Sequence, residues 1–145
     1  MPGNSMNLLK LKALLLLSLF SISAAQPAPE KLFLTFFGSP TCEECMTIEN
    51  TLLKPIEARY APALQIRYRN VDDAKDFNIL TAMEKGYAVK STAPQELFFP
   101  DTVLVGYEAI MKTGEKLIGY YVSHPEKWAY LHVLGDTTID TGKVK

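Results

Sequence analysis

Cysteine is scarce in this sequence, and its scarcity limits what disulfide chemistry can do for the fold. The chain holds two cysteines, Cys42 and Cys45, in 145 residues. A small exported domain that uses disulfides as scaffolding usually carries more cysteines, spread along the chain. A bridge across two intervening residues would also remove little disorder from the unfolded chain. The pair is therefore badly placed to be a structural crosslink and well placed to be a redox switch.

Strong charge and long apolar runs are also missing. The formal net charge is −1, and no basic stripe interrupts the mixed distribution of charges. A mildly acidic chain of this kind is a poor binder of nucleic acid, so that class of function is excluded. The longest apolar run, residues 13–20, is roughly half of the ~20 residues that a membrane-spanning helix needs.

The N-terminal segment has the order of a secretory signal peptide. Lys10 and Lys12 precede the apolar run, and the small residues Ser23 and Ala25 follow it. This order predicts a signal peptide over residues 1–25 that is cleaved on export, with an uncleaved membrane anchor as the alternative. Residues 26–30 are polar and rich in proline, which predicts a flexible leader before the folded domain.

The first half of the remaining chain alternates strands and helices. An apolar, aromatic run at residues 31–37 predicts a buried central strand. A helix is expected to begin near Cys42 and to end by Tyr60, with Pro55 kinking or splitting it. Residues 64–69 alternate in polarity, which predicts a second strand. Apolar spacing then predicts a helix that runs to about Lys85 and stops at Gly86.

The second half is predicted to form a hairpin and a last helix. Residues 87–99 have no readable pattern, and residues 102–105 are expected to form a strand that extends toward Ile110. A turn at 112–115 leads to an antiparallel partner strand at 116–122. A capping box at 123–126 opens a helix that ends at Leu134, and residues 136–145 form a tail. The result is one α/β domain over residues 31–135, with the order β-α-β-α-β-β-α, a mixed central sheet and helices on both faces.

A CxxC motif at the start of the first helix, within this order of elements, resembles the thioredoxin-like superfamily. Residues 36–45 carry the strongest part of the resemblance, and residues 114–120 resemble the final hairpin of the family. The narrower similarity is to small periplasmic thioredoxin-like thiol–disulfide oxidoreductases. It implies a periplasmic enzyme that needs no cofactor and exchanges disulfides with exported proteins. It also implies a membrane electron-transfer partner of the DsbD kind, or of the DsbB kind if the protein is an oxidase.

Disulfide exchange needs an exposed thiolate and a second thiol that resolves the mixed disulfide. A cysteine at a helix N-terminus is favoured as a thiolate by the unpaired backbone N–H groups and by the helix dipole. Cys42 is therefore predicted to be the attacking nucleophile. Cys45, one turn further along and more buried, is predicted to be the resolving thiol.

The residues around the cysteines depart from the thioredoxin pattern. Glu43 and Glu44 stand between the cysteines, and two carboxylates beside a thiolate raise its pKa and favour reductase behaviour over strong oxidation. The alternative is that both carboxylates point into solvent and have little effect. Thr41 replaces the usual tryptophan before the first cysteine, and it is expected, with the two glutamates, to tune the redox behaviour of the pair. Phe36 replaces a buried aspartate. These departures make a dedicated partner more plausible than general protein-disulfide reduction.

The resemblance also implies a cis-proline that faces the cysteines just before the third strand. Pro100 is the favoured candidate because a predicted strand follows it at once, and Pro94 is the alternative. Both residues are otherwise ordinary loop prolines, since the trans bond is the usual state of an X–Pro peptide.

Two other functions remain open at this point. The two thiolates with the neighbouring Met46 are soft ligands that suit Cu(I), so a copper-binding or copper-delivery protein of the cell envelope is the first alternative. The second is a binding module in which the Cys42–Cys45 disulfide is inert.

Overall fold

The structure is a computed structural model, and it describes residues 31–128. The predicted signal peptide (1–25), leader (26–30) and tail (136–145) lie outside the described residues. The strands are β1 (Leu32–Gly38), β2 (Leu64–Asn70), β3 (Glu96–Phe98) and β4 (Val103–Val105). The helical segments are α2 (Glu43–Ile48), the π-helical turn η2 (Glu49–Leu53), α3 (Lys54–Tyr60), α4 (Ala74–Gly86), α5 (Tyr107–Val122) and the 3-10 turn η3 (Pro125–Lys127).

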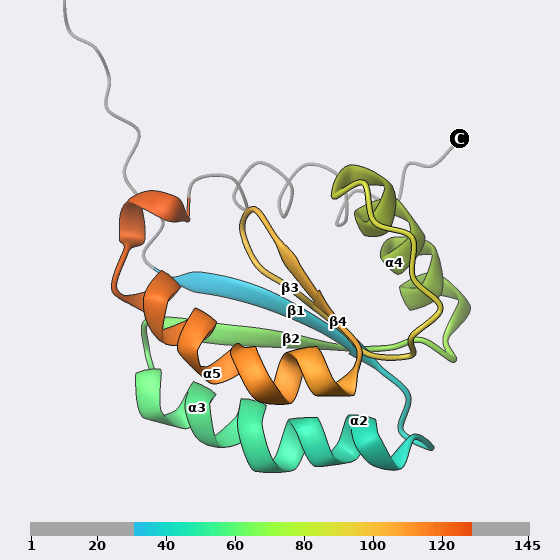
Figure 1. Ribbon diagram of the computed structural model, residues 1–145, viewed down its shortest axis with the longest axis horizontal. Helices are drawn as coiled ribbons and strands as arrows, with labels where there is room; N and C mark the ends of the chain where they lie inside the picture. The colour runs from blue at the N-terminus through green and yellow to red at the C-terminus, as the bar shows by residue number, and fades with distance from the viewer. Residues whose placement is uncertain (1–30, 129–145) are drawn as a thin grey trace, which may run out of the picture.

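The strands form one mixed sheet with the order β2-β1-β3-β4 (Figure 1). β1 pairs in parallel with β2, and β3 pairs antiparallel with both β1 and β4. β1 is a central strand because its side chains are apolar on both faces, as the sequence predicts. The expected mixed α/β architecture with a central sheet is therefore confirmed.

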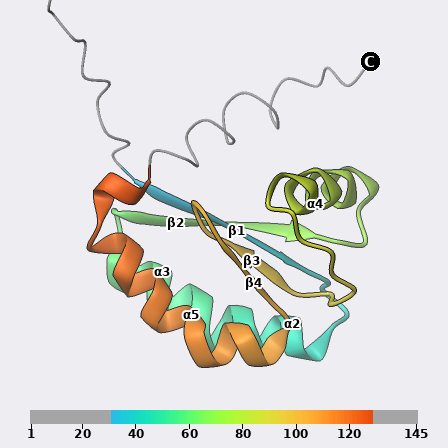
Figure 2. The same cartoon turned by 45° about the horizontal axis from the view of Figure 1, so that its top comes forward.

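Helices cover both faces of this sheet (Figure 2). On one face, Leu34 and Phe36 of β1 pack into the larger core cluster with residues of α2, α3 and α5. On the other face, Phe37 packs with Leu80 of α4 and with Phe98 in a smaller cluster. Successive side chains of a strand point to opposite faces, so a single strand feeds both clusters.

The first helical stretch runs from Glu43 to Tyr60 in three segments. Between α2 and α3 the chain makes the π-helical turn η2, and the backbone N–H of Lys54 donates to the carbonyl of Glu49. Pro55 lies in the first turn of α3, where its missing N–H is tolerated. The predicted disturbance at Pro55 is thus a local widening of the helix just before the proline.

The prediction for residues 107–122 was wrong. The predicted turn at 112–115 and strand at 116–122 are parts of the single helix α5. Gly114 is buried in this helix, and a Cβ added to it would lie 3.1 Å from Cδ2 of Leu52. A Cβ on Gly119 would lie 3.3 Å from Oη of Tyr60. The glycines let α5 approach the η2–α3 segment closely, and they do not form a turn.

The hairpin lies earlier in the chain than expected. It consists of β3 and β4, so the predicted strand at 102–105 is confirmed and its extension toward Ile110 is not. β3 falls inside the segment that had no readable pattern. The types of element follow one another as predicted over the described residues, but the last three lie earlier in the chain than expected, and α5 covers the residues of the predicted second hairpin strand.

The helix predicted to begin at the 123–126 capping box is only partly described. Residues 125–127 form the short 3-10 turn η3, and the rest of the predicted helix lies beyond Trp128, outside the described residues. Trp128 is buried in the larger cluster and donates from Nε1 to the carbonyl of Tyr121 at 2.7 Å. It anchors the end of α5.

α4 has well-defined ends. Asp73 caps the N-terminus and accepts hydrogen bonds from the backbone of Lys75 and Asp76. At the C-terminus, the N–H of Ala88 donates to Lys85 and the N–H of Val89 donates to Glu84. This pair of bonds is a Schellman motif, and Ala88 holds its left-handed position with φ of 54°. None of the helices within residues 31–128 is long and apolar enough to cross a membrane.

Candidate redox site

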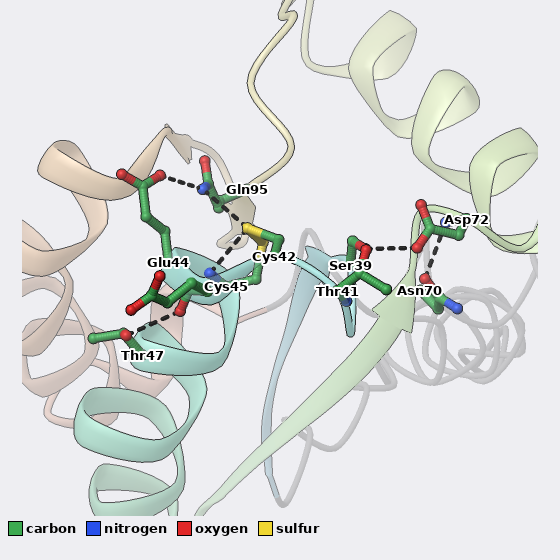
Figure 3. Close-up of a disulfide and its surroundings, with 10 residues drawn as sticks. Ser39, Thr41, Cys42, Glu44, Cys45, Thr47, Asn70, Asp72 and Gln95 are labelled. Atoms are coloured by element: carbon green, nitrogen blue, oxygen red, sulfur yellow. Dashed lines mark hydrogen bonds between the residues drawn. A yellow bond between two sulfur atoms is a disulfide. The ribbon is translucent and has the colours of Figure 1, made fainter.

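The two cysteines form a disulfide at the N-terminus of α2 (Figure 3). Cys42 is the N-cap residue, and its Sγ accepts a hydrogen bond from the backbone N–H of Cys45 at 3.1 Å. The Cα atoms of the pair lie 5.2 Å apart. Cys42 is partly exposed, whereas Cys45 is completely buried in the larger core cluster. An approaching chain therefore meets the sulfur of Cys42 first.

The loop between β1 and α2 sets the position of Cys42. The backbone N–H of Cys42 donates to the carbonyl of Ser39 at 3.2 Å, which closes a tight turn. Gly38 precedes this turn at a point of close approach. A Cβ at Gly38 would lie 2.8 Å from Cε1 of Phe36 and 3.2 Å from Cβ of Cys45. A larger residue would therefore push the disulfide away from the end of β1.

Polar side chains hold the same loop to the turn before α4. Ser39 donates from its hydroxyl to Oδ2 of Asp72 at 2.5 Å, and its Oγ lies 2.8 Å from Oγ1 of Thr41. The side chain of Thr41 is exposed and turned toward Ser39. Thr41 thus contributes to the shape of the loop, and its direct effect on the cysteines stays a prediction.

The two glutamates between the cysteines differ in their contacts. Both side chains are exposed, but a carboxylate oxygen of Glu44 accepts a hydrogen bond from Nε2 of Gln95 at 2.8 Å. The same nitrogen lies 3.5 Å from Sγ of Cys42. Gln95 therefore joins the carboxylate of Glu44 to the sulfur of Cys42. No ion pair between either glutamate and a basic side chain is found within residues 31–128.

Gln95 is a site residue that the sequence alone did not reveal. It directly precedes β3, and the register that pairs Phe37 with Glu96 carries it to the end of β1 beside the disulfide. Its side chain is 2% exposed. The one available signal was its position after Pro94, the less favoured candidate for the proline that faces the cysteines.

The expectation of a cis-proline at the site was wrong. Within residues 31–128 the cis peptide bond is Ala61–Pro62, so the bonds before Pro100 and Pro94 are trans. Pro100 is buried in the turn between β3 and β4, at the end of the hairpin that points away from the disulfide. Pro94 is exposed and adjoins Gln95, so it lies nearer to the cysteines than Pro100 does.

A buried carboxyl group lies next to Gln95 in the sequence but on the opposite face of the sheet. Glu96 is 1% exposed, and its Oε2 has no hydrogen-bond partner. Burial raises the pKa of Glu96 to about 7, and the negative charge of Glu84 on α4 adds to this rise, while a hydrogen bond with Ser91 opposes it. The group is thus protonated for part of the time near neutral pH, on the α4 side of the sheet.

The site has few side chains that could hold a metal ion. Within residues 31–128, no three His, Cys, Asp or Glu side chains are grouped closely enough to bind one. Met46, in the second half of α2, is 43% exposed. The copper-binding alternative therefore depends on the two sulfurs and on this thioether, and it stays a prediction.

Comparison with known proteins assigns no family to this chain. Neither the models of known protein families nor the curated proteins with which the sequence was compared match it. The geometry of the site offers one accessible sulfur at a helix N-terminus and a second sulfur, buried and already bonded to the first.

Proposed function

We propose that this chain is a thiol–disulfide oxidoreductase of the thioredoxin-like superfamily. The observation that carries the proposal is the unequal burial of the two disulfide-bonded cysteines at the N-terminus of α2. The β2-β1-β3-β4 sheet and the α/β order around it are compatible with a thioredoxin-like fold.

The reaction needs only the two cysteines and a substrate disulfide. In the reduced protein, the Cys42 thiolate attacks one sulfur of the substrate disulfide and releases the other substrate sulfur as a thiolate. The Cys45 thiol then gives its proton to the surrounding water and attacks the Cys42 sulfur in the mixed disulfide. This step releases the second substrate thiolate and leaves the Cys42–Cys45 disulfide. Two electrons pass from the protein to the substrate, and the reverse sequence oxidises a substrate dithiol.

We also propose that the reduced Cys42–Cys45 pair acts mainly as an electron donor, so that the protein reduces substrate disulfides more readily than it forms them. Glu43 and Glu44 place negative charge close to Cys42, and the described residues bring no cation into contact with its sulfur. A strong oxidant of the DsbA kind depends on a stabilised thiolate in its reduced form. Destabilising that thiolate makes the reduced pair a better electron donor.

We further propose that the protein acts in the periplasm on exported protein disulfides. The signal-peptide pattern of residues 1–25 supports export. A reductase outside the cytoplasm needs an electron source, and a membrane protein of the DsbD kind would supply it. Redox-state trapping in cells with and without such a membrane protein tests this link. The pair is expected to be mainly reduced only when the membrane protein is present.

Catalysed reduction of insulin by dithiothreitol tests the enzymatic proposal. The wild-type protein is expected to accelerate precipitation of the reduced insulin B chain, and Cys42→Ser is expected to abolish the acceleration. Cys45→Ser is expected to accumulate a mixed disulfide through Cys42, because the resolving thiol is gone. A wild-type rate no greater than that of Cys42→Ser would leave the disulfide as an inert crosslink.

The preference for reduction over oxidation is tested separately, by equilibrating the protein with glutathione redox buffers. The reduction potential of the pair is expected to lie well below that of DsbA, which is about −120 mV. A potential close to the DsbA value would contradict the reductase proposal but leave the oxidoreductase proposal intact.

A further inference from the structure

The side chain of Gln95 lies within hydrogen-bond distance of the sulfur of Cys42, so the strength of its hydrogen bond depends on the redox state of that sulfur. Its side chain is 2% exposed, and its backbone carbonyl accepts a hydrogen bond from Gly106 at 2.8 Å. The residue is thus held between the start of β3 and the end of β4. A buried amide group needs hydrogen-bond partners, because leaving it unpaired is costly. The partners of its nitrogen are the sulfur of Cys42 and the carboxylate of Glu44.

The chemistry of these partners fixes the orientation of the amide. An ionised carboxylate only accepts hydrogen bonds, so the nitrogen of Gln95 must face Glu44. That nitrogen has two hydrogens. It can therefore donate to Glu44 and to Cys42 at the same time, as the distances of 2.8 Å and 3.5 Å allow.

Reduction changes the value of these hydrogen bonds. In the disulfide the sulfur of Cys42 is a weak neutral acceptor, whereas in the reduced protein it can carry a full negative charge. Hydrogen bonds to a charged acceptor are roughly twice as strong as those between neutral groups. The amide of Gln95 therefore favours the thiolate over both the thiol and the disulfide.

Glu44 works in the opposite direction, and Gln95 keeps it in place. Its side chain is exposed, so without a partner its carboxylate would be free to move into water, where a dielectric constant of about 80 weakens its repulsion of the thiolate. The hydrogen bond from Gln95 holds the carboxylate beside the sulfur. Glu43 is also exposed and close in sequence, but the amide does not hold it.

We propose that Gln95 tunes the reactive sulfur by donating a hydrogen bond to the Cys42 thiolate and by holding Glu44 beside it as an opposing charge. The inference rests on the proposed function, because a tuned thiolate has a use only in disulfide exchange. Donation to the sulfur is the larger effect, since it acts on the charged atom directly. Other charges near this end of α2 are Glu43 and, through Ser39, Asp72.

The first test is titration of the Cys42 thiol in Gln95→Met, a substitution of similar length without a donor. A Cys45→Ser background confines the ultraviolet thiolate signal to Cys42. Gln95→Met is expected to raise the Cys42 pKa by about 1, which leaves about tenfold less thiolate at any pH well below it. In the protein with both cysteines, at a pH above the Cys42 pKa of both the wild type and the variant, the same tenfold change appears in the equilibrium with glutathione and corresponds to about 30 mV, toward a more negative potential. Gln65→Met, at an exposed site on β2, is the matched control and should change neither quantity.

The second test separates the two parts of the proposal. Glu44→Gln removes the charge but keeps an acceptor for Gln95, and it should lower the Cys42 pKa more than Glu43→Gln does. When Gln95→Met is also present, the effects of the two glutamate substitutions should become equal. If Glu44→Gln still lowers the Cys42 pKa more than Glu43→Gln does in the Gln95→Met background, Gln95 does not hold Glu44 beside the sulfur.

The donor role is overturned if Gln95→Met leaves the Cys42 pKa unchanged in a folded protein. If Gln95→Met does not fold, the two glutamate variants decide the matter, because both sites are exposed: equal effects of Glu44→Gln and Glu43→Gln overturn the proposal, and a larger effect of Glu44→Gln supports it. The titrations need no substrate. A wild-type protein that fails to reduce insulin would thus refute the proposed function without deciding these measurements.

Discussion

The two faces of the sheet are stabilised in different ways. The face covered by α2, α3 and α5 carries a cluster of sixteen buried residues, including Cys45, whereas the cluster under α4 has three. The α4 face also contains the buried carboxyl group of Glu96, one oxygen of which has no partner. Apolar packing does not depend on pH, but a buried carboxyl group does. The face that carries the disulfide is thus expected to stay folded at pH values that destabilise the α4 face.

The largest expected effect comes from truncating neighbouring phenylalanines that point to opposite faces. Phe36 and Phe37 are both completely buried, and Phe→Ala substitutions in cores cost about 3–5 kcal/mol of unfolding free energy. Phe36→Ala is expected to lie near the top of this range and to shift the reduction potential, because the Phe36 ring packs beside Gly38 and the disulfide loop. Phe37→Ala should lie near the bottom and leave the potential unchanged.

Urea unfolding measures the stability difference, and glutathione equilibration measures the potential. The pair of variants serves as its own control, since the two side chains are identical and adjacent. Equal shifts of the potential in the two variants would show that the faces are not independent.

A smaller effect is expected from Glu96→Gln, and it should depend on pH. Glu96 has a pKa of about 7 in the folded protein, above the ordinary value of 4.5. The folded state therefore binds this proton more tightly than the unfolded state does. The resulting stability is fully present below pH 4.5 and is lost as the pH rises through 7. At pH 8 the neutral Glu96→Gln variant is expected to be more stable than the wild type by about 2–3 kcal/mol.

The measurement is urea unfolding of both proteins at pH 5 and pH 8. The stability difference between them should be small at the lower pH and should grow as the pH rises. Glu108→Gln, at an exposed site in the first turn of α5, is the control for loss of a carboxylate. A difference of the same size at both pH values would mean that Glu96 is not the titrating group.

The smallest effect concerns the C-terminal end of α4. Ala88 has a φ of 54°, and a residue with a Cβ is strained there by roughly 1–2 kcal/mol. Glycine relieves this strain but loses more entropy on folding, so Ala88→Gly is expected to stabilise the protein by about 0.5–1 kcal/mol. Thermal unfolding measures the gain. Ala82→Gly, at an exposed position inside the same helix, should instead destabilise it by about 1 kcal/mol. A lower stability of Ala88→Gly than of the wild type would contradict the inference that the backbone at Ala88 is strained.

The elements around the cysteines were predictable because their signals are local. An unbroken apolar run produces β1, and the capping position of Cys42 follows from the turn at residues 39–41. In α5, the buried residues recur at helical spacing, yet Thr113-Gly114 also has the composition of a turn. Gly114 in fact serves contact with Leu52, which is far away in the sequence, so no local rule separates the two roles.

The site was predictable only in part for the same reason. The order of Cys42, Glu43, Glu44 and Cys45 is local information, and the exposure of the two glutamates and the burial of Cys45 follow from the helix that carries them. Gln95 reaches the sulfur because β3 pairs with β1 in one particular register. The strand that follows Pro100 is the second of the hairpin, whereas β3 itself begins after Pro94, so the rule that favours Pro100 selects the wrong strand. Strand register is a property of the whole sheet and was not accessible from the residues alone.

The hydrogen bonds at the end of β1 have a consequence for how much the protein tolerates change elsewhere. The N–H of Val71 donates to the carbonyl of Gly38 at 3.0 Å, and Ser39 bonds to Asp72 next to it. The segment between these two points, residues 39–71, carries both cysteines, and its two ends are therefore bonded to each other. Insertions or deletions between Tyr87 and Pro94 fall outside this segment. Changes in length there can alter the surface next to Gln95 and the Cys42 sulfur without displacing α2.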